Sequence, residues 1–161
     1  MIEQRHIRAQ SPDALTVIVT GDMVLDVPDA DHWLSGIAPA LRAADLTIAH
    51  IEVPHTRRGA EVKGDVPAPG ADPDHLDALA RAGAGMASLA GNHIADCGPQ
   101  GITDTVERLQ ELGIAHAGAG INLAAASRPA YASRRGQRVG LLSYNCVGPE
   151  FAWADEARAG C

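Results

Sequence analysis

Aromatic residues are scarce in this sequence, since Phe, Trp and Tyr together make up 3% of its 161 residues and Phe occurs once. Alanine, valine, leucine and isoleucine must therefore fill the interior. The hydrophobic content of 46% is ordinary for a globular chain and argues against disorder of the whole chain. The three cysteines (Cys97, Cys146 and Cys161) are odd in number and show no CxxC spacing, which favours reduced thiols in a reducing compartment.

A long apolar run is also missing. The first eight residues, MIEQRHIR, contain no apolar core of a signal peptide, and no later segment approaches the length that spans a bilayer. We therefore expect a cytoplasmic chain without membrane insertion.

Basic residues are outnumbered by acidic residues, 13 against 20, and the formal net charge is −7. This charge argues against broad electrostatic binding of nucleic acid or anionic lipid. If the substrate is a phosphate or a carboxylate, a cation must offset the negative field of the protein. A bound metal ion is the natural candidate.

Strand-like runs alternate with helical patterns along the chain, and 161 residues suit one domain or part of one. The alternation predicts βαβ units, and hence an α/β fold with a mostly parallel sheet flanked by helices. The clearest helix follows Pro99, where apolar residues repeat with helical spacing until Gly113. The predicted strands are 15–20 (a buried strand), 46–52, 86–90, 114–117, 129–133 and 138–145, with a hairpin turn at 134–137; the predicted helices are 35–44, 73–82 and 99–112.

Two segments are predicted as loops. Residues 26–32 are rich in Asp and Pro, and residues 54–73 turn to Arg, Gly, Pro and Asp, which predicts a long surface loop. Three further histidines lack a partner at ligand spacing and are predicted as surface or strand-end residues: His55, His75 and His116.

Polar side chains follow three of the predicted strands. Asp22 comes after the first strand, His50 and Glu52 share one side of the second strand at its carboxyl end, and Asn92 and His93 follow the third. In a parallel sheet these positions open at the same edge. Carboxylate and amide oxygens together with an imidazole make a plausible site for a divalent cation.

Each of these residues also has an ordinary structural explanation. Asp22 could cap a turn, and Glu52 could be a solvated loop carboxylate. Asn92 and Asp96 could be turn formers, and His93 could be a half-buried histidine bonded to a backbone carbonyl. The metal-site interpretation depends on the ordered set rather than on any one residue.

The same motifs resemble the poly-γ-glutamate capsule biosynthesis (CapA-type) proteins. The matching stretches are TGD at 20–22, HIE at 50–52, LAGNHIADCG at 89–98, GITDTVERL at 101–109, GIAHAGAG at 113–120 and RP at 128–129. The resemblance covers about residues 15–145. That family is similar to the calcineurin-like metallophosphoesterases, whose sheet edge carries one or two divalent metals.

The resemblance implies roles for particular residues. Asp22, Glu52 and Asn92 would be metal ligands, and His50, which stands where the family usually has asparagine, could also ligate the metal. His93 would handle protons and Asp96 would orient it. The implied cofactor is a divalent ion such as Mn, Fe, Zn or Mg, and the implied chemistry is metal-assisted hydrolysis or transfer on an anionic small-molecule or polymer substrate.

Family members run to roughly twice this length as one domain, and their second half supplies further histidine ligands. We therefore expect residues 1–161 to be one incomplete, metallophosphoesterase-like α/β sandwich from a truncated, split or fragmentary member, in a family often associated with the cell envelope. The alternative is a catalytically inactive remnant, or an assembly or binding subunit that needs a partner chain or forms a homo-oligomer.

Overall fold

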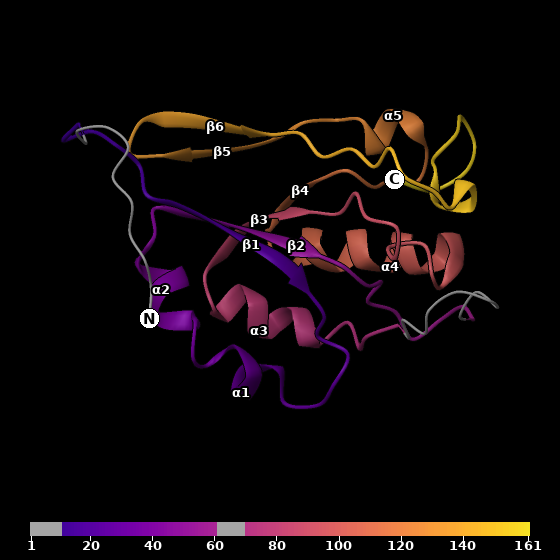
Figure 1. Cartoon of the computed structure of the whole chain (residues 1–161), viewed down its shortest axis with the longest axis horizontal. Helices are drawn as coiled ribbons and strands as arrows, with labels where there is room; N and C mark the ends of the chain where they lie inside the picture. Colours follow the sequence, from indigo (N-terminus) through magenta and orange to yellow (C-terminus); the bar gives the residue numbers. More distant parts are fainter. Residues whose placement is uncertain (1–10, 61–69) are drawn as a thin grey trace.

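The computed structural model describes residues 11–60 and 70–161, and its centre is a four-stranded parallel sheet (Figure 1). Each strand pairs in parallel with the next one along the chain, so the sheet order follows the sequence order. The predicted α/β fold with a parallel sheet is therefore confirmed. The strands are β1 (Val17–Met23), β2 (Leu46–Ile51), β3 (Ala84–Ser88) and β4 (Ala115–Ala117).

Helices cover one face of this sheet and enclose the larger core. The apolar stripe predicted for the helix after Pro99 is buried in that core, at Ile102, Val106 and Leu109. Within the described residues, no helix combines the length and the apolar character needed to cross a membrane. The helices between the strands are α1 (Ala30–Leu34), α2 (Ala38–Ala43), α3 (His75–Arg81) and α4 (Gly98–Glu111).

A β-hairpin covers the opposite face of the sheet (Figure 1). It consists of β5 (Ala130–Arg134) and β6 (Gln137–Leu141), which pair in antiparallel fashion. The turn residues Arg135 and Gly136 both have positive φ angles, 48° and 77°, as a two-residue hairpin turn requires. The predicted hairpin is confirmed, although β6 ends before the predicted limit at residue 145. The short helices α5 (Leu123–Ala126) and η1 (Glu150–Ala152) flank the hairpin in sequence.

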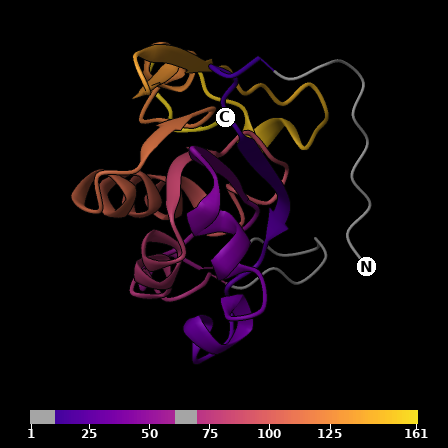
Figure 2. The same ribbon diagram turned by 90° about the vertical axis from the view of Figure 1, so that its left-hand side faces the viewer.

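The first strand differs from its prediction in extent and in burial. β1 continues to Met23, so Asp22 lies in the strand and not after it, with a register shift between Val19 and Asp22. β1 is an edge strand, whereas the sequence predicts a buried one, and Val19 is 68% exposed. The physical reason is that the hairpin packs over β2, β3 and β4, so that no described residue covers this face of β1. In Figure 2 the hairpin lies above the sheet and β1, in indigo, lies at its right-hand margin.

The predicted helix 35–44 is confirmed as α2, which begins three residues later than predicted and has Pro39 in its first turn. The prediction for residues 26–32 is wrong in part, because α1 begins inside this predicted loop. Ser35 ends α1 as its C-cap rather than starting a helix, while Asp29 accepts the His32 N–H at the start of α1. An ion pair between Arg81 and Asp31 ties α1 to α3, a tertiary contact that local sequence patterns do not reveal.

The beginning of the predicted surface loop 54–73 is buried. His55 is fully buried: its N–H donates to Thr105 Oγ1 of α4 at 2.7 Å, and its Nδ1 donates to Val53 O at 3.1 Å. His55 is thus not a surface residue, because α4 holds it inside. His75 is half-buried with Nδ1 2.6 Å from Leu25 O, and His116 is half-buried in β4. Residues 61–69 of this loop lie outside the described residues.

Candidate metal centre

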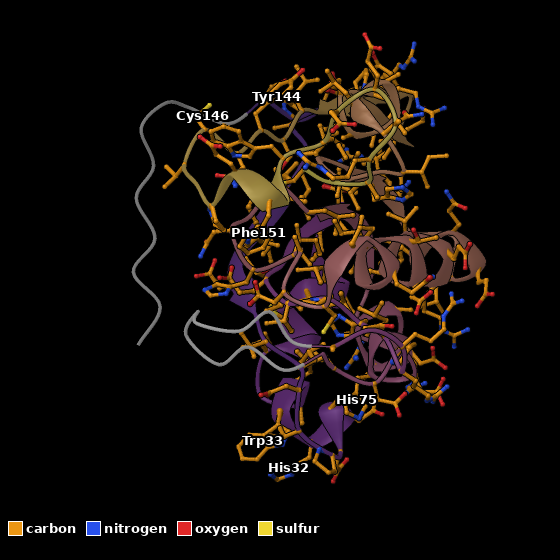
Figure 3. All side chains as sticks on the ribbon, turned by 90° about the vertical axis from the view of Figure 1, so that its right-hand side faces the viewer. His32, Trp33, His75, Tyr144, Cys146 and Phe151 are labelled. Carbon is orange, nitrogen blue, oxygen red and sulfur yellow. The ribbon has the colours of Figure 1, made fainter. Side chains whose placement is uncertain are left out.

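Three side chains of the kinds that bind metals meet at the carboxyl ends of β1 and β2. His50 Nε2 lies 3.2 Å from Glu52 Oε2 and 3.8 Å from Asp22 Oδ1. The three potential ligand atoms all lie within 4.8 Å of one another. Strand pairing produces this cluster, because Asp22 is the register neighbour of His50 and Glu52 follows two residues later on the same side. Figure 3 faces the side of the molecule toward which these strands run.

The cluster fits a divalent cation in charge and in space. Within residues 11–60 and 70–161, Asp22 and Glu52 form ion pairs with histidines alone, so no lysine or arginine neutralises them. Gly91 lies against the cluster, and a Cβ added there would be 3.2 Å from His50 Nε2 and 4.0 Å from Glu52 Oε2. The absence of a side chain at Gly91 therefore leaves the space beside these ligand atoms open. Two carboxylates and one imidazole suit Mn, Fe or Zn in particular.

A second histidine adjoins the cluster from the loop between β3 and α4. His93 Nδ1 lies 2.7 Å from Asp96 Oδ2, and Asp96 is buried. Because the Asp96 carboxylate accepts the Nδ1–H of His93, the Nε2 atom is directed the other way, 3.9 Å from Glu52 Oε1. The Glu52 carboxylate thus lies between the rings of His50 and His93.

The sequence of this loop explains its shape. The Asp96 N–H donates to His93 O, and the Gly98 N–H donates to Ala95 O, which forms two successive turns. Gly98 has a φ of 70°, a conformation that glycine adopts without strain, and Pro99 follows in the first turn of α4. These turns bring His93 and Asp96 together three residues apart.

The structure therefore brings together most of the residues that the sequence singles out. Asp22, His50 and Glu52 form one cluster, and His93 with Asp96 borders it. Asn92 is half-buried in the same loop, directly before His93. Its role as a ligand, like the catalytic roles of His93 and Asp96, stays a prediction.

Two serines near His50 are missing from the sequence-based set. Ser88 Oγ lies 3.3 Å from His50 Nδ1, and Ser143 Oγ lies 2.8 Å from Ser88 Oγ. The sequence signal for Ser88 is a polar residue near the end of an apolar strand. Ser143 has no such signal, since it is 55 residues away in the sequence.

The chain has an α/β fold, and carboxylates and histidines gather at the carboxyl edge of its parallel sheet. These features place it in the class of α/β proteins with a candidate divalent-metal centre. The chain belongs to the family described as "Bacterial capsule synthesis protein PGA_cap", which it matches over residues 8–160. The resemblance to CapA-type proteins is thereby confirmed.

Two relatives illustrate how much of such proteins this chain represents. It is 40% identical over 85 residues to a protein of Mycobacterium tuberculosis named probable polyglutamine synthesis accessory protein, a match that covers 51% of this chain and 22% of that protein. It is 30% identical over 145 residues to the uncharacterized protein y4sH of Sinorhizobium fredii, a match that covers 81% of this chain and 30% of that protein. The chain thus spans less than a third of the length of these relatives.

Proposed function

We propose that this chain is a CapA-type capsule-biosynthesis protein whose metal centre supports hydrolysis or transfer on an anionic substrate, either a small molecule or a polymer such as polyglutamate. The family match and the name of the mycobacterial relative support the capsule role. The observation that carries the metal-dependent part is the cluster of Asp22, His50 and Glu52 at the carboxyl edge of the sheet.

In this proposal Asp22, His50 and Glu52 hold the ion, and Asn92 adds a ligand from the neighbouring loop. When bound, a divalent cation polarises a phosphoryl or carbonyl group and lowers the pKa of a bound water. It also offsets the two carboxylates, so that an anionic substrate can approach a chain of net charge −7.

His93 serves as the proton-handling residue. Its Nδ1–H is held by the buried Asp96 carboxylate at 2.7 Å, which fixes the ring orientation. The Nε2 atom, on the side of Glu52, is then the nitrogen that gives a proton to a leaving oxygen or accepts one from water.

Isothermal titration calorimetry with Mn²⁺ and Zn²⁺ tests the metal centre. We expect binding by the wild type and a loss of at least about tenfold in affinity in Glu52→Gln, because one charged ligand is removed. Glu156→Gln, the same change at an exposed position, is the matched control and should bind like the wild type. Negligible binding of both metals by the wild type, or equal binding by Glu52→Gln, would refute the proposal.

A second candidate function is the binding of a partner chain, and the uncovered face of β1 favours it. Val17 and Val19 are 39% and 68% exposed, and beyond β6 Leu142 and Tyr144 are 60% and 63% exposed. Tyr144 is labelled in Figure 3. Asp22 lies at the end of β1, so a chain that covers this strand would border the metal centre. In this alternative the chain is inactive alone and serves as an assembly or binding subunit.

A further inference from the structure

A row of hydroxyl groups connects His50 to the second layer of the molecule. Ser88, the last residue of β3, is the register neighbour of His50, and its Oγ lies 3.3 Å from His50 Nδ1. Ser143, which follows β6, places its Oγ 2.8 Å from Ser88 Oγ and accepts the Ala90 N–H at 3.2 Å. His50 is thus contacted at both ring nitrogens, by Glu52 at Nε2 and by Ser88 at Nδ1.

The protons in this row have two consistent arrangements. In the first, His50 Nε2–H donates to the Glu52 carboxylate, the Ser88 hydroxyl donates to His50 Nδ1, and the Ser143 hydroxyl donates to Ser88. In the second, His50 Nδ1–H donates to Ser88 and the Ser88 hydroxyl donates to Ser143, which leaves the Nε2 lone pair available. Ser143 Oγ accepts the Ala90 N–H in both arrangements, because a hydroxyl oxygen has two lone pairs.

Hydroxyl groups are what make both arrangements possible. A backbone carbonyl in the place of Ser88 could only accept, and it would hold the proton on Nδ1 permanently. Without an ion, the Glu52 carboxylate 3.2 Å from Nε2 favours the first arrangement, since a hydrogen bond to a charged acceptor is the stronger one. A metal ligand needs the Nε2 lone pair, which requires the second.

The backbone after β4 leaves room for this row. Gly118 has a φ of 100°, and a Cβ added there would lie 2.7 Å from both Ser143 Oγ and the Ala90 nitrogen. A side chain at this position would push Ser143 away from Ser88. The row therefore depends on four segments that meet only in the folded protein: β2, the end of β3, the backbone after β4 and the backbone after β6.

We propose that Ser88 and Ser143 are positioning residues that let His50 change tautomer when a divalent cation binds. The inference rests on the proposed metal centre, in which His50 is a ligand. Neither serine binds the ion: Ser88 acts through the His50 ring, and Ser143 acts through Ser88.

The test combines zinc titration of the full chain with NMR of its histidine rings. Long-range ¹H–¹⁵N spectra identify which ring nitrogen carries the proton, and we expect Nε2 in the metal-free protein and Nδ1 in the zinc-loaded protein. Ser88→Ala should bind zinc about 10- to 100-fold more weakly. Ser88→Thr keeps the hydroxyl and should recover most of that loss, and Ser133→Ala on β5 is the matched control.

The outcomes separate this inference from the proposed function. If Ser88→Ala binds zinc with wild-type affinity, or if the His50 tautomer is the same with and without zinc, the two serines are not positioning residues. The proposed metal centre would be unaffected by either result. If the wild type binds no zinc, both the proposed metal centre and the proposed role of the two serines are refuted. If Ser88→Ala does not fold, as judged by circular dichroism, Ser143→Ala provides the same test because it removes the partner of Ser88.

Discussion

His55 shows, at the scale of one residue, how burial controls protonation. Its side chain is fully buried, and its Nε2 has no hydrogen-bond partner in the described part of the chain. Burial lowers the pKa of His55 from 6.5 to about 4, because the charged ring loses its hydration, and the hydrogen bond to Val53 O only partly opposes this shift.

This shift predicts a loss of stability in acid. The unfolded chain takes up a proton at His55 as the pH falls through 6.5, whereas the folded chain resists until about pH 4. The contribution of the neutral His55 ring to the stability of the folded state is therefore complete above pH 6.5, and it is lost as the pH falls toward 4. Between about pH 7 and about pH 4.5 we expect a contribution of about 2–3 kcal/mol to the fall in the free energy of unfolding.

Urea unfolding at several pH values measures this contribution, with His55→Asn as the comparison. The asparagine amide can donate to Val53 O as the imidazole does, but it does not titrate. The variant should lack the His55 part of the pH dependence, while the carboxylates contribute equally to both proteins. Parallel stability curves for the wild type and His55→Asn would contradict the buried neutral imidazole.

At the scale of the element, α4 anchors the loop that begins after β2. Thr105 is fully buried; its hydroxyl donates to Gly101 O within α4 and accepts the His55 N–H at 2.7 Å. Thr103 makes the same kind of bond within the helix, to Pro99 O, on the exposed side. The two threonines differ in burial, and among the bonds of the described residues Thr105 but not Thr103 accepts the His55 amide.

Thr105→Val should therefore lower the free energy of unfolding by about 1–3 kcal/mol, because it leaves a buried backbone N–H without an acceptor. Thr103→Val is the matched control and should change stability by about 0.5 kcal/mol or less. Chemical denaturation of both variants measures the difference. Equal losses in the two variants would mean that the His55 amide is not held by Thr105.

The elements also show which patterns could be predicted from the sequence. The loop before α4 and α4 itself were predictable, because the glycines, Pro99 and the apolar stripe are local signals, whereas β3 begins and ends two residues before its predicted bounds at 86 and 90. α1 was not, since it is short and is tied to α3 by the ion pair between Asp31 and Arg81. The exposure of β1 was not predictable either, because it depends on where the hairpin packs.

Within the candidate site, too, some contacts could be predicted from the sequence and others could not. His50 and Glu52 were placed together by the two-residue strand repeat, whereas the pairing of His93 with Asp96 was implied by the family resemblance. Ser143 could not be found in this way, because its contact with Ser88 joins two layers of the fold. Residues that support a site from another layer leave no local pattern.

At the scale of the whole molecule, the main feature is an unfinished second layer. The hairpin covers β2, β3 and β4, while no element among residues 11–60 and 70–161 covers the exposed Val17 and Val19 of the edge strand β1. Exposed apolar side chains on an edge strand favour association with another chain. In a pure sample the available partner is a second copy of the chain.

We therefore expect concentration-dependent self-association of the isolated chain, measurable by sedimentation velocity. Val19→Lys should shift the distribution toward the monomer, since it places a charge in the uncovered face. Val27→Lys makes the same substitution before α1, at a residue that is 42% exposed, and should leave the association unchanged. A wild type that stays monomeric at all concentrations would argue against the partner-binding alternative.

Anomalous X-ray diffraction at the zinc edge shows whether Asp22, His50 and Glu52 together bind a divalent cation. Crystals of the wild type grown with zinc should show an anomalous peak between these three side chains, and Glu52→Gln crystals should lose that peak. Zinc found only at other residues, such as the exposed Cys146, or no peak at the edge of the sheet, would mean that these three side chains do not form a metal site.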